Sequence, residues 1–177
     1  MIPSDHFVYF YNEIFKELEK LGPEALDRYY ARVADRQAYF TLEAFKRDGL
    51  KGMYDYWERI RIEENCQSVN ELDEKRGLYQ ARMLKCPSLT KALESDAGPC
   101  RVYCNHCPGW VNRVITQAGY YVCYNLVGRE APQCMYVVTK DRQVAEAKRR
   151  EWLRDYSPDL ISDNFAEVDR LRSASKG

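Results

Sequence analysis

Two short segments rich in β-branched and aromatic residues, "YYVCYNLV" at 120–127 and "QCMYVVT" at 133–139, are separated by only five residues, "GREAP". A parallel pair of strands needs a crossover connection of a dozen or more residues, so this spacing allows only an antiparallel hairpin. A third segment, "LYQARMLK" at 78–85, alternates as a strand does. We therefore expect strands near 77–85, 119–127 and 133–139 to share one antiparallel sheet.

The first third of the chain has the periodicity of amphipathic helices. After Ser4, apolar residues recur at steps of three and four, and this run ends at Gly22-Pro23. A second, longer helix follows as far as about Asp48-Gly49, and a third is expected in "GMYDYWERIRIEEN" at 52–65. We expect residues 5 to about 65 to be mostly helical, and "CQSVNELDEKRG" at 66–77 to be a polar linker.

A chain of 177 residues fits one domain. The order of segments is helices, a strand, a helix from Pro108 to Ala118, the hairpin and a last surface helix at about 141–156, which is typical of an α+β domain. We expect the helices to gather on one face of the antiparallel sheet. The single α+β domain 1–177 then has a helical part at 1–70, a sheet-forming part at 75–156 that holds a cysteine cluster, and a tail at 157–177, of which the end, "RLRSASKG" at 170–177, is expected to be frayed.

Charge and composition narrow the classes of partner. Lysine plus arginine and aspartate plus glutamate both number 27, so a nucleic-acid partner is not expected. The start "MIPSDHFVYF" does not have the pattern of a signal peptide, and no run of about 18 apolar residues occurs, so no membrane partner is expected. Seven cysteines in such a chain favour thiols over disulfides. We expect a cytoplasmic protein with a small-molecule substrate or ligand, and a homodimer stays open.

The stretch "CRVYCNHCPGW" at 100–110 concentrates the reactive side chains. Cys100, Cys104 and Cys107 have the C-x3-C-x2-C spacing of an iron–sulfur loop, but the helical segments before them do not match the barrel that holds that loop in radical-SAM enzymes. A zinc site needs four ligands, and Cys104 with Cys107 form one close pair that only the fold could complete. A metal-binding module with zinc or an Fe–S centre is therefore one alternative.

A nucleophilic thiol is the second interpretation. Pro108 is favoured in a first helical turn, which puts Cys107 at or next to the N-cap, where backbone N–H groups point at its sulfur. The neighbouring His106 would help to lower the pKa of this thiol, and Cys104 lies just before it, so these three are candidate catalytic residues. Plain packing is the third interpretation, and we favour it for Cys66 and Cys123.

The same segment predicts a pocket. Strand ends and a helix start meet at one edge of a sheet, so we expect Cys86, Cys104, Cys107 and Cys134 to surround a common cavity. Trp110 returns to the side of the helix that carries Cys107 and would form a wall of this cavity.

Candidate substrate-binding residues are therefore Trp110, Tyr103, Cys86 and Cys134. Cys123 and Cys134 lie one on each hairpin strand, where a disulfide stays open although packing is the commoner outcome.

Four features taken together resemble the L-2-amino-thiazoline-4-carboxylic acid hydrolase-like family. They are Cys86-Pro87 at a strand end, "YCNHCPGW" at 103–110, Ala118-Gly119 before the hairpin, and Cys134 at the start of its second strand. The resemblance implies a small cytosolic hydrolase that opens a cyclic amidine-like ring by adding water at C2, giving a carbamoyl-cysteine. It also implies that cysteines are important to activity and that no cofactor is required.

A second similarity is to 4-vinyl-reductase-like ligand-binding domains. These place helices before a small antiparallel sheet and carry a cysteine on a strand such as Cys134-Met135-Tyr136-Val137-Val138. That resemblance implies a sensor or binding module in place of an active site. A scaffold whose helical N-terminus binds a partner is the remaining alternative, and fold analogy alone does not choose among the three.

Overall fold

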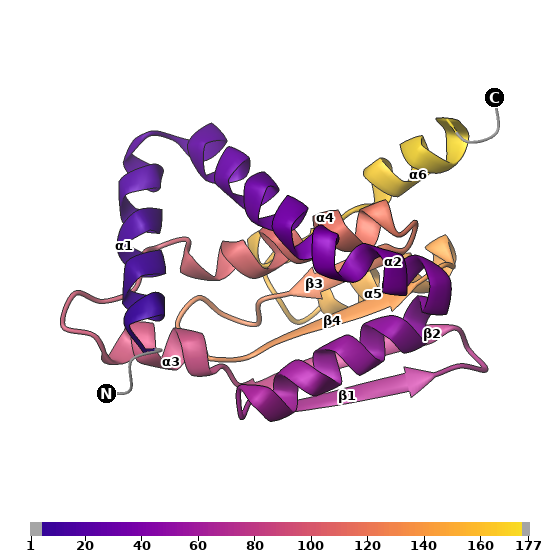
Figure 1. Cartoon of the computed structure of the whole chain (residues 1–177), viewed down its shortest axis with the longest axis horizontal. Helices are drawn as coiled ribbons and strands as arrows, with labels where there is room; N and C mark the ends of the chain where they lie inside the picture. The colour runs from indigo at the N-terminus through magenta and orange to yellow at the C-terminus, as the bar shows by residue number, and fades with distance from the viewer. Residues whose placement is uncertain (1–4, 175–177) are drawn as a thin grey trace.

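The N-terminal part is helical, as the periodicity predicts. The structure is a computed structural model that describes residues 5–174. Helix α1 (Asp5–Lys20) is followed by α2 (Pro23–Glu63), which is kinked at Gly49, where φ is 61° and ψ is −134°. The two arms of α2, 23–48 and 50–63, fold back on each other as a V, with α1 near its open end (Figure 1). The predicted break at Asp48-Gly49 is confirmed.

Five antiparallel strands form one sheet in the order β1-β2-β4-β3-β5. The strands are β1 (Gln67–Asp73), β2 (Leu78–Lys85), β3 (Tyr121–Asn125), β4 (Cys134–Thr139) and β5 (Ile161–Asp163). The hairpin of β3 and β4 is antiparallel and sets Tyr124 opposite Tyr136. The three predicted strands and their common sheet are confirmed.

The expected linker at 66–77 is wrong, because most of it is the edge strand β1. Its side chains alternate between exposed and partly buried, and the inward ones include Ser68 and Asn70, whose polarity concealed the strand pattern. Strand β1 pairs with β2 on one side, and the second arm of α2 lies over it (Figure 1). These polar side chains are accommodated because Asn70 finds hydrogen-bond partners within the fold.

The helices cover both faces of the sheet, so the expectation of helices on one face is wrong. One face packs Tyr79, Val122 and Val138 against α2 and against α4 (His106–Gln117), the helix expected at 108–118. The other face packs Val137 and other side chains against α5 (Arg142–Trp152) and α6 (Phe165–Ala174). Strands buried on both faces explain why β3 is buried at every position. The fold class, α+β with a helical N-terminal third on an antiparallel sheet and flanking helices, is as expected.

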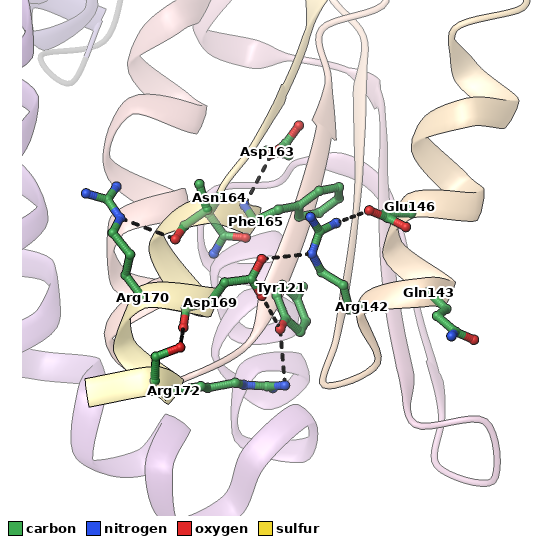
Figure 2. Close-up of polar contacts among 12 residues, drawn as sticks. Tyr121, Arg142, Gln143, Glu146, Asp163, Asn164, Phe165, Asp169, Arg170 and Arg172 are labelled. Carbon is green, nitrogen blue, oxygen red and sulfur yellow. Dashed lines mark hydrogen bonds and ion pairs between the residues drawn. The ribbon is translucent and has the colours of Figure 1, made fainter. Parts of the chain in front are cut away.

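The expected tail at 157–177 is also wrong as far as residue 174. It contains a short 3-10 helix, η2 (Pro158–Leu160), then β5 and α6. Figure 2 shows how α6 is held. Tyr121 donates a hydrogen bond to Asp169 Oδ1 at 2.7 Å, and Arg142 Nε lies 3.2 Å from Asp169 Oδ2. The Arg142 guanidinium also lies 4.4 Å from the ring centre of Phe165, so aromatic and charged contacts together dock this helix.

A short helix that the sequence analysis missed, α3 (Pro87–Glu94), follows β2. The thiol of Cys86 caps it by accepting a hydrogen bond from the backbone N–H of Leu89 at 3.4 Å. With the short 3-10 helix η1 (Tyr103–Asn105), α3 packs beside α1 around Phe15. Within residues 5–174, no helix is both long and apolar enough to cross a membrane.

Candidate functional site

A cavity of about 370 Å³ lies between α2, α4 and one face of the sheet. Its volume falls within the range of about 300–1,000 Å³ that is usual for small-molecule sites. Helix α2 contributes Gln37, Tyr56, Trp57 and Ile60; the sheet contributes Ala81, Met83, Tyr124 and Tyr136; α4 contributes His106, Trp110 and Val111. Tyr11 of α1 lines it as well, and Arg61 and the exposed Glu64 supply charged groups. The wall is therefore mainly aromatic and aliphatic.

The two arms of α2 meet beside this cavity. Gln37 Nε2 of the first arm donates to the hydroxyl of Tyr56 in the second arm at 3.4 Å. The Tyr56 ring packs edge-on against Phe45, at 5.7 Å between ring centres, and against Trp57, at 4.4 Å. The cavity thus depends on the kink at Gly49, which returns the second arm to the first.

Four thiols line the cavity, namely Cys66, Cys86, Cys107 and Cys134. The predicted convergence of Cys86, Cys107 and Cys134 is thereby confirmed. Cys104 is not part of the lining, but its charge would raise the pKa of Cys107, so it lies close behind the wall. Cys66, for which packing was expected, is a lining residue, and all seven cysteines are free.

The thiol of Cys107 is not activated as the sequence analysis expected. Helix α4 begins at His106, so Cys107 is its second residue, with Asn105 at the N-cap. Burial raises the pKa of Cys107 well above its usual value, and the nearby thiols Cys134, Cys86 and Cys104 raise it further. A hydrogen bond from Tyr124 opposes this effect, but it ranks behind the other causes. The expectation of a lowered pKa is wrong because desolvation outweighs the helix N-terminus.

His106 does not act on that thiol as a charged neighbour. His106 is 8% exposed, and its ring packs against Phe15 and Trp110, with ring centres 5.4 Å and 4.6 Å away. Burial lowers the pKa of His106 to about 4, so the imidazole is neutral near pH 7. Its Nδ1 lies 2.5 Å from the backbone oxygen of Tyr103. Because a carbonyl oxygen only accepts, Nδ1 carries the proton, and Nε2 is the acceptor nitrogen.

The other predicted site residues are divided between the cavity and the core. Trp110 lines the cavity, as expected of a wall. Tyr103 does not, because it is 2% exposed in the cluster beside α1 and its hydroxyl pairs with Ser88 Oγ at 2.6 Å. Cys123 faces the opposite side of the sheet, opposite Val137 and beneath α5, so it forms no disulfide with Cys134.

The spacing of Cys100, Cys104 and Cys107 does not translate into a metal site. The Cys100 thiol points to α1, where it donates to Glu19 Oε2 at 3.2 Å. Among residues 5–174, no three or more histidine, cysteine, aspartate or glutamate side chains are arranged to hold a metal ion. The three cysteines therefore do not form a common ligand set, although their C-x3-C-x2-C spacing is that of an iron–sulfur loop.

A hydrogen-bond chain that sequence reasoning missed runs along the cavity. Glu58 Oε2 accepts from Asn70 Nδ2 at 2.9 Å, and Asn70 Oδ1 accepts from the Tyr79 hydroxyl at 3.0 Å. The Tyr79 and Tyr136 hydroxyl oxygens are 3.1 Å apart. Tyr136 then stacks on Tyr124, at 5.2 Å between ring centres and 18° between planes, and the Tyr124 hydroxyl lies 3.4 Å from Cys134 Sγ.

No local signal in the sequence could have found this chain. Asn70 lies in a segment that reads as a polar linker, and Glu58 reads as part of a solvated helix face. Tyr79 was visible only as a strand residue, and Tyr136 only as one of several tyrosines near the cysteine segment that could line a pocket or pack in the core. Their meeting depends on the pairing of β2 with both β1 and β4, which brings together residues up to 78 positions apart in the chain.

Comparisons with protein-family models, curated proteins and solved structures find no match to this chain. The resemblance to the thiazoline hydrolase-like family therefore stays a prediction.

Proposed function

We propose that this protein binds an uncharged, mainly apolar small molecule in the cavity between α2, α4 and the sheet. The observation that carries the proposal is a cavity of about 370 Å³ whose wall is mostly aromatic and aliphatic. Aromatic rings such as Trp57, Trp110 and Tyr136 suit a flat ligand, because offset or edge-on contacts add to the area that they bury.

The electrostatics of the wall support a neutral ligand. Burial keeps His106 uncharged and raises the pKa of the Cys107 and Cys134 thiols, that of Cys134 to about 11. Among the described lining residues the cation is Arg61, which Glu58 engages in an ion pair at 2.5 Å. A buried charge without a partner is costly, so an ionised ligand would find no compensation in the inner part of the cavity.

Binding is better supported than hydrolysis. A thiol nucleophile needs a lowered pKa or a base beside it. Here burial raises the pKa of Cys107 and lowers the pKa of His106 to about 4, so the unprotonated Nε2 of His106 is a weak base near pH 7. The hydrolase interpretation stays a prediction, while the alternative of a small-molecule binding or sensor module fits the described wall.

The test uses N-phenyl-1-naphthylamine, an uncharged probe whose fluorescence rises in apolar surroundings. We expect saturable binding, weakened at least about tenfold in Met83→Trp, because Met83 lines the cavity and an indole there would fill it. The matched control is Leu84→Trp, the next residue of β2, which is 44% exposed and outside the cavity. It should leave the affinity unchanged.

Two results would contradict the proposal. The first is no binding by the unaltered protein, or equal binding by the two tryptophan variants. The second is consumption of 2-amino-thiazoline-4-carboxylate, followed by NMR, that is lost in Cys107→Ser. That second result would restore the hydrolase interpretation, because it requires the thiol that burial is argued to suppress.

A further inference from the structure

In the hydrogen-bond chain from Glu58 through Asn70 and Tyr79 to Tyr136, the carboxylate of Glu58 determines which group donates in each bond. The ion pair with Arg61 and the hydrogen bond from Asn70 lower the pKa of Glu58, so its carboxylate is ionised and only accepts. Asn70 must therefore turn its Nδ2 to Glu58, which leaves Oδ1 to accept from Tyr79. The amide orientation is thus fixed by charge.

The hydroxyl groups of Tyr79 and Tyr136 continue the chain toward the cavity. Tyr79 has one hydroxyl proton and gives it to Asn70, so toward Tyr136 its oxygen can only accept. Tyr136 is then the donor in the 3.1 Å contact with Tyr79. Tyr79 is fully buried, whereas Tyr136 lines the cavity. With its proton committed, the Tyr136 oxygen has only lone pairs left for a ligand.

We propose that the ligand of this cavity presents a neutral O–H or N–H donor to the phenol oxygen of Tyr136, as an apolar alcohol, phenol or amide would. This inference rests on the proposed binding function and adds its specificity. An ether or ketone at the same place would set two acceptors against each other and leave both unpaired, which buried sites discriminate against strongly. A carboxylate would add an uncompensated charge.

The experiment compares four probes of one shape by displacement of N-phenyl-1-naphthylamine and by calorimetry. They are 2-naphthol, 2-methoxynaphthalene, naphthalene and 2-naphthoate. A net hydrogen bond corresponds to roughly a three- to tenfold change in affinity. We expect 2-naphthol to bind more tightly than 2-methoxynaphthalene and naphthalene by about that factor, and 2-naphthoate to bind most weakly.

Two hydroxyl deletions assign the preference. Tyr136→Phe should remove the advantage of 2-naphthol, because the acceptor is gone. Tyr79→Phe should also reduce it, but for another reason: Tyr136 is then free to donate, so 2-methoxynaphthalene should gain affinity. Tyr54→Phe is the matched control, since the Tyr54 ring lies 6.3 Å from that of Tyr79 and does not line the cavity. Thermal unfolding checks that each variant is folded.

The outcomes distinguish failure of this specificity proposal from failure of the binding function on which it rests. If no probe binds the unaltered protein, the binding function itself fails. If the probes bind with equal affinity, or if the preference survives Tyr136→Phe, the oriented acceptor is wrong while binding stands. If 2-methoxynaphthalene gains nothing in Tyr79→Phe, the direction of the chain is wrong. If a variant does not fold, the comparison of the four probes on the unaltered protein still tests whether the cavity prefers a ligand that donates a hydrogen bond.

Discussion

The kink of α2 should depend on the glycine at its centre. Gly49 has φ 61° and ψ −134°, a conformation that glycine adopts readily and other residues do not. A Cβ placed there would also lie 2.6 Å from the hydroxyl oxygen of Tyr120, a residue that is 6% exposed. Gly49→Ala therefore meets a backbone penalty and a steric one.

The size of the effect follows from these two penalties. A strained φ/ψ pair costs about 1–3 kcal/mol, and an overpacked contact typically costs a similar amount. Replacing glycine by alanine returns about 0.4–1 kcal/mol by restricting the unfolded chain. We expect Gly49→Ala to lower the free energy of unfolding by about 3 kcal/mol, measured by urea denaturation followed by circular dichroism.

Two comparisons separate the penalties. Gly77 also has a positive φ, 59°, but a Cβ there meets nothing within 4 Å, so Gly77→Ala should cost only about 1 kcal/mol. Adding Tyr120→Phe to Gly49→Ala removes the atom at 2.6 Å and leaves the ring carbon at 3.8 Å, so about half of the loss should return. Equal costs for the two alanines, or no recovery in the double variant, would refute the reasoning.

Two further predictions concern the buried titratable groups. Iodoacetamide labelling near pH 8 with peptide mapping should modify Cys66 faster than Cys107, because burial raises the pKa of both thiols but raises that of Cys107 well above its usual value; equal rates would contradict this. Burial lowers the pKa of His106 to about 4, whereas the unfolded chain binds that proton near 6.5. Stability is therefore lost as pH falls, and between pH 7 and 4 the unaltered protein should lose about 3 kcal/mol more than His106→Gln in urea titrations.

The elements that the sequence predicted are those set by local constraints. Five residues between two strands leave no room for a crossover, so the β3–β4 hairpin needed no knowledge of the rest of the fold. The break of α2 was visible because Asp48-Gly49 interrupts an otherwise helical run. Helix α4 followed from Pro108 in its first turn.

The elements that it missed are held by distant partners. Strand β1 carries polar side chains inward, and Asn70 is paired with Glu58 and Tyr79, which come from α2 and β2. Helix α6 is docked by contacts of Asp169 with Tyr121 and Arg142, 48 and 27 positions away. Neither set of contacts produces a periodic pattern in the sequence of its own segment, so local propensity cannot reveal it.

The candidate site shows the same division between local and distant causes. The meeting of Cys86, Cys107 and Cys134 followed from where strand ends and a helix start lie, but the state of the thiols did not. A helix N-terminus stabilises an anion by about 0.3–1 kcal/mol, whereas burial of a charged group can shift its pKa by several units. Burial prevails for Cys107, which lies on α4 at the wall of the cavity that α2 and the sheet complete.

The raised pKa of these thiols and the proposed preference for a neutral ligand have one cause. Desolvation that keeps Cys107 and His106 uncharged would keep a bound molecule uncharged too. The carboxylate of Glu58 stands apart from this environment, since Arg61 and Asn70 stabilise it. Glu58 affects the cavity only by determining which group donates in the hydrogen bonds of Asn70, Tyr79 and Tyr136. In such a site a charge at the edge can set specificity inside without placing any charge against the ligand.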